Sequence, residues 1–126
     1  MHADTGCTFT PDSRLVQVAA EMFALLSDPT RLQIILALRD GELSVNHLAD
    51  IVDKTPASVS QHLARLRLSR MVAARQDGTR VFYRLANEHA RRLAVDAIFQ
   101  AEHSVAETPS HHRHGVTPSD IATSIR

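Results

Sequence analysis

A short stretch of the chain gathers side chains that bind metal ions. Residues 101–115, AEHSVAETPSHHRHG, contain four histidines and two glutamates. Imidazole nitrogens and carboxylate oxygens are ligands for divalent transition metals. Because Cys7 is the one cysteine of the sequence, no thiolate cluster can form within the chain. The stretch predicts a metal site of nitrogen and oxygen donors. A solvated polar run is the alternative interpretation of its last histidines, and for His114 it is the one we favour.

The composition is that of one small helical domain. The chain has 126 residues, of which 44% are hydrophobic and 4% aromatic, with no Trp. This length suits a single domain, and the excess of aliphatic over aromatic residues favours packed helices. No apolar run is long enough to cross a bilayer, and the sequence does not begin with a basic segment followed by an apolar one. We therefore expect a cytoplasmic protein without membrane contact, and a lone cysteine suits that reducing compartment.

Charge is unevenly distributed along the chain. Fourteen Lys and Arg balance fourteen Asp and Glu, so the formal net charge is zero. Between residues 54 and 92 the balance is basic, because this segment holds nine basic residues and two acidic ones, Asp77 and Glu88. The basic residues are Lys54, Arg65, Arg67, Arg70, Arg75, Arg80, Arg84, Arg91 and Arg92. A basic segment of this kind can bind the phosphate backbone of DNA.

Periodicity divides the chain into three parts. Residues 1–11 have no regular pattern and are expected to form a flexible arm. Residues 12–104 are expected to form the folded domain, with a first helix that begins at Asp12 or Ser13. Residues 105–126 are polar, contain prolines and are expected to form a flexible tail that carries histidines.

A second helix is expected from Pro29 to Arg39. Asp28 can cap its N-terminus, and proline is favoured at the first helical position because its missing N–H costs nothing there. Gly41 is the expected stop. The helix therefore has a start signal and a stop signal of its own.

Two short helices joined by a tight turn are expected next. Ser44 can cap the first of them, and Thr55 followed by Pro56 can open the second. In this second helix the apolar stripe that faces the core is formed by Val59, Leu63 and Leu66. Such a pair of helices is typical of a helix-turn-helix, whose second helix lies in the major groove of DNA.

A small β-hairpin and a last helix complete the predicted fold. Asp77 and Gly78 form a strong hairpin signal between two short segments with alternating apolar residues. Asn87 can cap an amphipathic helix that continues to about His103. The fold class is mainly α with a small β-hairpin, a winged helix-turn-helix.

The DNA contacts are expected on the second helix of the pair, at the turn before it and on the hairpin. Short donors and acceptors suit base edges, and basic side chains suit phosphates. The expected DNA-binding residues are Lys54, Thr55, Ser58, Ser60, Gln61, His62, Arg65, Arg75 and Arg80. An ordinary solvated helix face is the alternative for the helix residues. For His47 and His62, packing or a phosphate contact is favoured over metal ligation.

These motifs resemble the ArsR/SmtB metal-sensing repressors. The likeness covers about residues 14–103 and is carried by LSDPTRLQIILAL, SVSQHLARLR and RQDGTRVFYRL. Within that family the segments NEHARRL and DAIFQAEH, with the tail HHRH, look most like the KmtR-type nickel and cobalt sensors. The resemblance implies a homodimer, joined through its terminal helices, that binds operator DNA without metal and releases it when metal binds.

The resemblance also indicates which metal ligands to expect. The family's cysteine pair is absent, because the segment LSVNHLAD has Ser44 and Asn46 instead, so a thiolate site for arsenic, cadmium or lead is not expected there. The NmtR-type pattern would need Asp and His where this chain has Asn87 and Gln100. The KmtR-like ligand set, transferred residue by residue, is His89, Glu102, His103, His111 and His112.

Helix geometry requires two copies of the chain for such a site. His89 and His103 are fourteen positions apart, or about 21 Å along one helix, whereas ligand atoms lie about 2 Å from their metal. An antiparallel copy of the helix would bring His89 toward Glu102 and His103 of its mate, and symmetry would make two equal sites. Five nitrogen and oxygen donors favour Ni(II) or Co(II), although Zn(II) could occupy a subset of them. Since imidazole must be neutral to bind, metal affinity should fall as the pH falls through the histidine range.

Two other functions are alternatives to this one. The first is a repressor of the same family that senses Zn(II) or a non-metal signal, in which case the histidines are incidental. The second is a metal hydrolase, which would need an acid or base beside an open metal position in a cleft. The sequence offers no such element, so we expect that the protein is not an enzyme.

Overall fold

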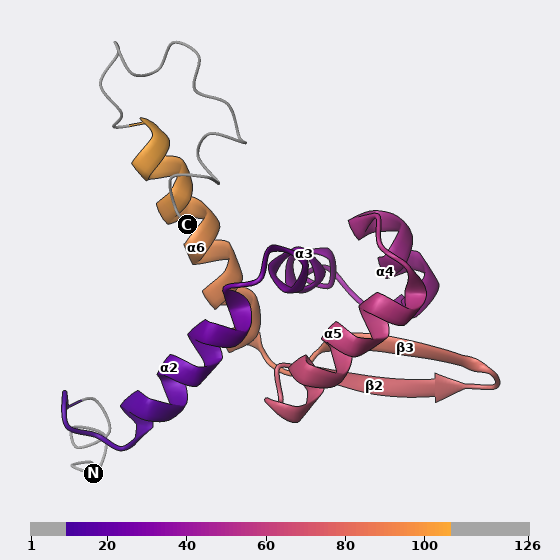
Figure 1. Cartoon of the computed structure of the whole chain (residues 1–126), viewed down its shortest axis with the longest axis horizontal. Helices are drawn as coiled ribbons and strands as arrows, with labels where there is room; N and C mark the ends of the chain where they lie inside the picture. Colours follow the sequence, from indigo (N-terminus) through magenta and orange to yellow (C-terminus); the bar gives the residue numbers. More distant parts are fainter. Residues whose placement is uncertain (1–9, 107–126) are drawn as a thin grey trace. The chain divides into compact units, whose positions relative to one another are not determined.

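Figure 1 shows the computed structural model of the chain, in which residues 10–106 are described. The chain divides into two compact units, Met1–Ala94 and Val95–Arg126, and the boundary falls within the last helix. The elements in chain order are α2 (Leu15–Leu26), α3 (Pro29–Ala37), β1 (Leu43–Ser44), α4 (Val45–Val52), α5 (Pro56–Leu68), β2 (Val72–Asp77), β3 (Arg80–Leu85) and α6 (Glu88–Ala106). A helix pair, α4 and α5, followed by a strand hairpin confirms the winged helix-turn-helix.

Four helices begin at the side-chain caps that the sequence predicts. In each case a side-chain oxygen of the cap accepts a hydrogen bond from a backbone N–H three residues later, which satisfies one of the unpaired donors of the first turn. The capping distances are 2.9 Å for Asp28 to Arg31, 3.2 Å for Ser44 to His47, 3.1 Å for Thr55 to Ser58 and 3.1 Å for Asn87 to Ala90. Helices α3 and α5 also have proline in their first turn. Local sequence therefore decides where these helices start.

The turn between α4 and α5 is tight. Helix α4 ends at Val52, and its C-cap is Asp53, whose backbone is left-handed with φ of 56°. The N–H of Lys54 donates to the carbonyl of Ala49 at 3.1 Å. Aspartate tolerates the left-handed region better than most residues with a side chain. The cap Thr55 follows at once, so only a short turn separates the two helices.

Helix ends differ from the sequence prediction by up to three residues. Helix α3 ends at Ala37 rather than Arg39, because the N–H of Leu38 is shared between the carbonyls of Ile34 and Ile35 and the chain tightens into a turn. Gly41 lies beyond that turn and is not the stop. The first helix begins at residue 15 rather than 12 or 13, and α6 continues to residue 106 rather than 103.

The sheet has three strands, not the two of the predicted hairpin. The additional strand β1 pairs antiparallel with β3, so the strand order is β1-β3-β2. A two-residue strand shows no period, which is why the sequence pattern missed it. The hairpin itself is confirmed, with Asp77 opposite Arg80 and the loop formed by Gly78 and Thr79. Gly78 has φ of 64°, a conformation that glycine adopts without steric cost.

The core lies between α3, α4 and α5, with the sheet and the start of α6 packed against it. Ile34, Ile35 and Leu48 have no exposed surface. The predicted inward stripe of α5 is equally buried, and it consists of Val59, Leu63 and Leu66. Burying each of these side chains contributes about 1.5–3 kcal/mol. Their burial decides which face of α5 remains outside.

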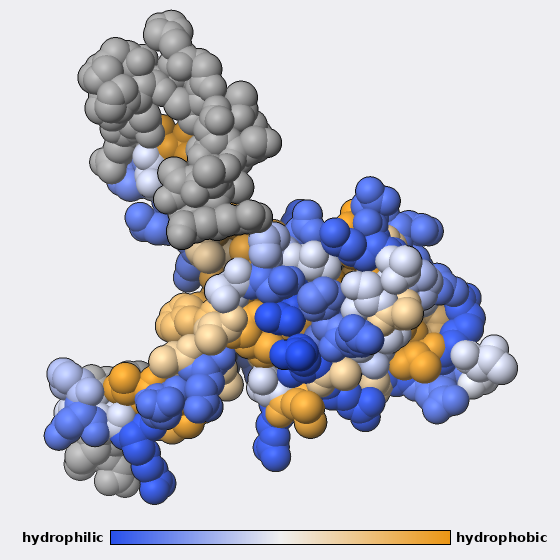
Figure 2. Space-filling view, in the orientation of Figure 1, coloured by the Kyte–Doolittle hydropathy of each residue, from blue (hydrophilic) through white to orange (hydrophobic). Residues whose placement is uncertain are grey.

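The terminal helices carry apolar side chains that the fold leaves exposed. On α2 the exposed large apolar residues are Leu15, Val16, Val18 and Phe23, and on α6 they are Ile98, Phe99 and Val105. Phe23 is 59% exposed and Phe99 62%. Figure 2 shows apolar surface along α2. Grouped apolar residues on a surface mark an interaction site. No helix in the described part of the chain is long and apolar enough to cross a membrane.

Removal of the cap on α5 should destabilise the domain. We expect Thr55→Ala to lower the free energy of unfolding by about 1 kcal/mol and the melting temperature by roughly 5 °C, because the N–H of Ser58 loses its acceptor. Thermal unfolding followed by circular dichroism measures both quantities. Thr79→Ala at the exposed hairpin loop is the matched control, with an expected change within about 0.5 kcal/mol. Equal losses in the two variants would contradict a capping role for Thr55.

Candidate metal centre and nucleic-acid interface

Helix α5 presents most of the expected DNA contacts on its exposed side. On α5 and in the turn before it, the exposed residues of the predicted set are Lys54, Thr55, Ser60, Gln61 and Arg65. Ser58 is half-buried, and its N–H is used by the helix cap. The N-terminus of a helix carries partial positive charge and unpaired N–H groups, which favour phosphate nearby. This end of α5 therefore combines a favourable dipole with short polar side chains.

His62 points into the fold more than the sequence indicated. Its side chain is 21% exposed, and its Nδ1 lies 3.3 Å from Nη1 of Arg31 and 3.9 Å from a carboxylate oxygen of Asp28. Since arginine can only donate, a neutral His62 accepts at Nδ1 and carries its proton on Nε2. Arg31 also donates through Nε to the carbonyl of Leu25 at 2.7 Å. His62 thus ties α5 to the start of α3, and only its Nε2–H remains as a donor for DNA.

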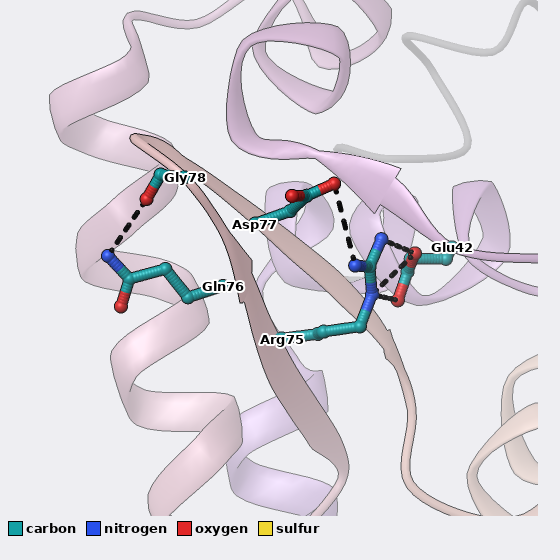
Figure 3. A network of polar contacts seen from close by, with 5 residues as sticks. All are labelled: Glu42, Arg75, Gln76, Asp77 and Gly78. Atoms are coloured by element: carbon teal, nitrogen blue, oxygen red, sulfur yellow. Dashed lines mark hydrogen bonds and ion pairs between the residues drawn. The ribbon is translucent and has the colours of Figure 1, made fainter.

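Arg75 of the wing is hydrogen-bonded to the carboxylate of Glu42, a residue that no pattern in the sequence indicates. Its Nε donates to both carboxylate oxygens of Glu42, at 3.1 and 3.0 Å, and its Nη2 donates to Oε1 at 2.6 Å. Figure 3 shows the guanidinium turned toward Glu42. Its Nη1 lies 3.8 Å from a carboxylate oxygen of Asp77. The guanidinium also lies over the ring of Phe82, 4.8 Å from its centre. The guanidinium of Arg75 is therefore held by contacts to Glu42 and Phe82, and the side chain is 47% exposed.

The electrostatics of this pair favour the charged forms. The hydrogen bond from Arg75 lowers the pKa of Glu42, assisted by the positive charges of Arg75 and Arg84 and opposed by burial. The same hydrogen bond raises the pKa of Arg75. Both groups thus stay ionised at any pH near neutrality. Glu42 went unnoticed in the sequence because its partner is 33 residues away and no local pattern reports that contact.

Arg80 has different surroundings from Arg75. Its guanidinium lies 5.0 Å from the centre of the Phe82 ring, and within the described residues no carboxylate pairs with it. Arg80 is exposed next to the hairpin loop. Of the two wing arginines expected at DNA, Arg80 is the one that forms no ion pair within the described residues.

The metal candidates that the structure describes lie on α6. His89, Glu102 and His103 are all exposed. His89 and His103 are separated by fourteen residues, close to four turns, so they share one face of the helix. Residues 10–106 of a single chain contain no group of three or more His, Cys, Asp or Glu side chains arranged to hold a metal ion. His111 and His112 lie outside the described residues, as do His114 and Cys7.

His89 also lines a cavity of about 230 Å³ in the first unit. Met22 of α2 and Met71 at the end of the turn after α5 contribute to its wall, together with the cap Asn87. Apolar surface dominates the cavity, and Arg70, which also lines it, has a left-handed backbone with φ of 61°. The start of α6 and the segment after α5 therefore line the same cavity.

Comparison with known proteins agrees with this arrangement. Residues 28–74 match the bacterial regulatory protein family named arsR. The chain is 51% identical to the HTH-type transcriptional regulator KmtR of Mycobacterium tuberculosis over 113 residues, which cover 90% of this chain and 86% of that protein. It is 33% identical to the HTH-type transcriptional repressor SmtB of the same species, over 72% of this chain and 67% of that protein.

A solved structure shows the same fold. The homodimeric winged helix-turn-helix DNA-binding domain Mb0332 of Mycobacterium bovis, studied as fragment 1–100, superposes with a TM-score of 0.66 at 31% identity, over 77% of this chain and 91% of that one. The family to which these relatives belong consists of DNA-binding regulators rather than enzymes. The long match to KmtR and the winged helix-turn-helix place the chain in the arsR family of bacterial transcriptional regulators.

Proposed function

We propose that this chain is a homodimeric repressor that binds operator DNA without metal and releases it when Ni(II) or Co(II) binds between the two subunits. Membership of the arsR family supports the regulatory part. One observation carries the metal part: exposed nitrogen and oxygen donors lie near both ends of α6, with His89 at one end and Glu102 and His103 at the other.

The exposed apolar residues of the terminal helices support a dimer. Phe23 on α2 and Phe99 on α6 are each more than half exposed, which is costly for a monomer in water. A second copy that packs against both helices would bury these side chains. The solved relative from Mycobacterium bovis is homodimeric and has the same fold.

In the proposed dimer two copies of α6 cross in antiparallel orientation. His89 of one subunit then lies beside Glu102 and His103 of the other, and the two-fold axis produces a second, equal site. His111 and His112 of the tail are proposed to complete the coordination. A set of imidazole and carboxylate donors without sulfur suits Ni(II) and Co(II), and it also binds Zn(II).

Metal can control DNA binding only if it binds two states of the dimer with different affinities. A metal that binds the two states equally shifts nothing, so the site must be better formed in the dimer with low DNA affinity. The two recognition helices of a dimer have to meet half-sites about one DNA turn apart. Bridging the two α6 helices fixes the relative position of the subunits, and with it the spacing of the two copies of α5.

Substitution of one helix ligand should abolish metal-driven release. We expect His103→Ala to bind a labelled operator duplex as the unsubstituted protein does but to lose the roughly 5- to 150-fold weakening that metal produces. Fluorescence anisotropy during titration with Ni(II), Co(II) and Zn(II) measures this. His47→Ala removes an exposed histidine of α4 and is the matched control that retains the response. A metal response that persists in His103→Ala favours a repressor sensing another signal.

Complementation between two defective subunits should show that each site is shared. His89→Ala and His103→Ala homodimers each lack a ligand in both sites and should bind nickel weakly. In a heterodimer of the two variants one site loses both histidines, whereas the other keeps both. We therefore expect a heterodimer purified by two tags to bind about one nickel ion, half the stoichiometry of the unsubstituted dimer. No recovery in the heterodimer would contradict an intersubunit site.

A further inference from the structure

The outer face of the wing presents three arginines. Arg75 is opposite Phe82, Asp77 is opposite Arg80, and Ala73 is opposite Arg84 across the β2–β3 pair. Residues directly opposite each other, and every second residue along a strand, share a face of the sheet. Arg75, Arg80 and Arg84 therefore lie on the same face. Each is a candidate for a contact with a DNA phosphate.

Glu42 changes the availability of one of them. It precedes β1, which lies on the far side of β3 from the strand that carries Arg75. The guanidinium of Arg75 lies over the ring of Phe82 and reaches this carboxylate. Figure 3 shows the contacts between Arg75 and Glu42. Nε and Nη2 form the three hydrogen bonds to Glu42, and Nη1 faces Asp77. Glu42 therefore occupies the Nε–Nη2 edge of the guanidinium, the edge that presents two parallel donors to paired oxygens.

A phosphate would have to compete with Glu42 for these donors. A carboxylate and a phosphate present similar paired oxygens to the fork of an arginine, so the two acceptors are alternatives. Glu42 belongs to the same chain, 33 residues from Arg75 in sequence, and the fold already holds its carboxylate beside the guanidinium. A phosphate, by contrast, has to be brought from solution and positioned. Arg80 faces no such competitor in the described part of the chain.

We infer that Glu42 is a positioning residue that withholds Arg75 from DNA phosphates and leaves the phosphate contacts of the wing to Arg80 and Arg84. Arg75 clamps the hairpin to the segment before β1 and contributes no phosphate contact of its own. The wing binds DNA less tightly than its arginines would allow, and Glu42 sets that limit. This inference rests on the DNA binding proposed above.

The salt dependence of DNA binding tests this inference, because each phosphate contact adds about 0.9 to the slope of log affinity against log salt concentration. The probe is a labelled duplex of about 30 base pairs, roughly three helical turns, enriched from a random pool by the unsubstituted protein. We expect Glu42→Gln to bind roughly threefold or more tightly and to steepen the slope by about 1.8 per dimer, one new contact in each subunit. Arg80→Gln should reduce the slope by about the same amount.

Two variants separate a released Arg75 from a simple loss of negative charge. Asp77→Asn removes another carboxylate near Arg75, at 3.8 Å, but leaves the paired hydrogen bonds to Glu42, so its slope should match the unsubstituted protein. The double variant Glu42→Gln with Arg75→Gln should return to that same slope. Thermal unfolding of each variant shows that the fold is kept, and NMR titration of Glu42 should give a lower pKa in the unsubstituted protein than in Arg75→Gln.

The possible results separate this inference from the proposed function. An unchanged or shallower slope in Glu42→Gln would overturn the inference, and so would a double variant with a shallower slope than the unsubstituted protein, because Arg75 would then contact phosphate despite Glu42. A slope for Asp77→Asn as steep as that of Glu42→Gln would overturn it as well. If the unsubstituted protein enriches no duplex from the pool, the proposed DNA binding fails and the inference fails with it.

Discussion

The burial of one stripe of α5 is the constraint on which the remaining features depend. Val59, Leu63 and Leu66 have no exposed surface. Their burial fixes the orientation of the helix about its own axis. Gln61 and Arg65 are outside because these three are inside. The cap Thr55 fixes where the helix begins, and the left-handed Asp53 fixes how closely it follows α4. Core packing therefore selects the surface that can meet DNA.

Local sequence predicted the elements well, because caps, prolines and apolar spacing act over a few residues. Thr55 and Asn87 could be recognised as caps for that reason. Contacts between distant segments have no such local signal. The strand β1 is two residues long, and its pairing with β3 spans about forty residues, so periodicity could not reveal it. The same limit hid the contacts that turn His62 toward Arg31 and Arg75 toward Glu42.

Charge counted along the chain overstates the charge that the wing presents. The basic segment begins at residue 54, so Glu42 lies outside it in sequence, yet in the fold its carboxylate hydrogen-bonds Arg75. The lowered pKa of Glu42 and the raised pKa of Arg75 have this common cause. A potential felt by DNA depends on charges in space, and screening limits it to about a Debye length. The number of arginines in the wing therefore exceeds the positive charge that the wing presents to DNA.

The second half of α6 imposes a condition of its own. From residue 96 to residue 106 every side chain is exposed, and isolated helices of about a dozen residues are marginal in water. The exposed Ile98, Phe99 and Val105 could supply the missing stability only if another surface covered them. A second copy of the chain is a partner that the proposed metal site also requires. The stability of this helix and the completeness of the site are then two consequences of one association, so metal ligation and subunit packing cannot vary independently.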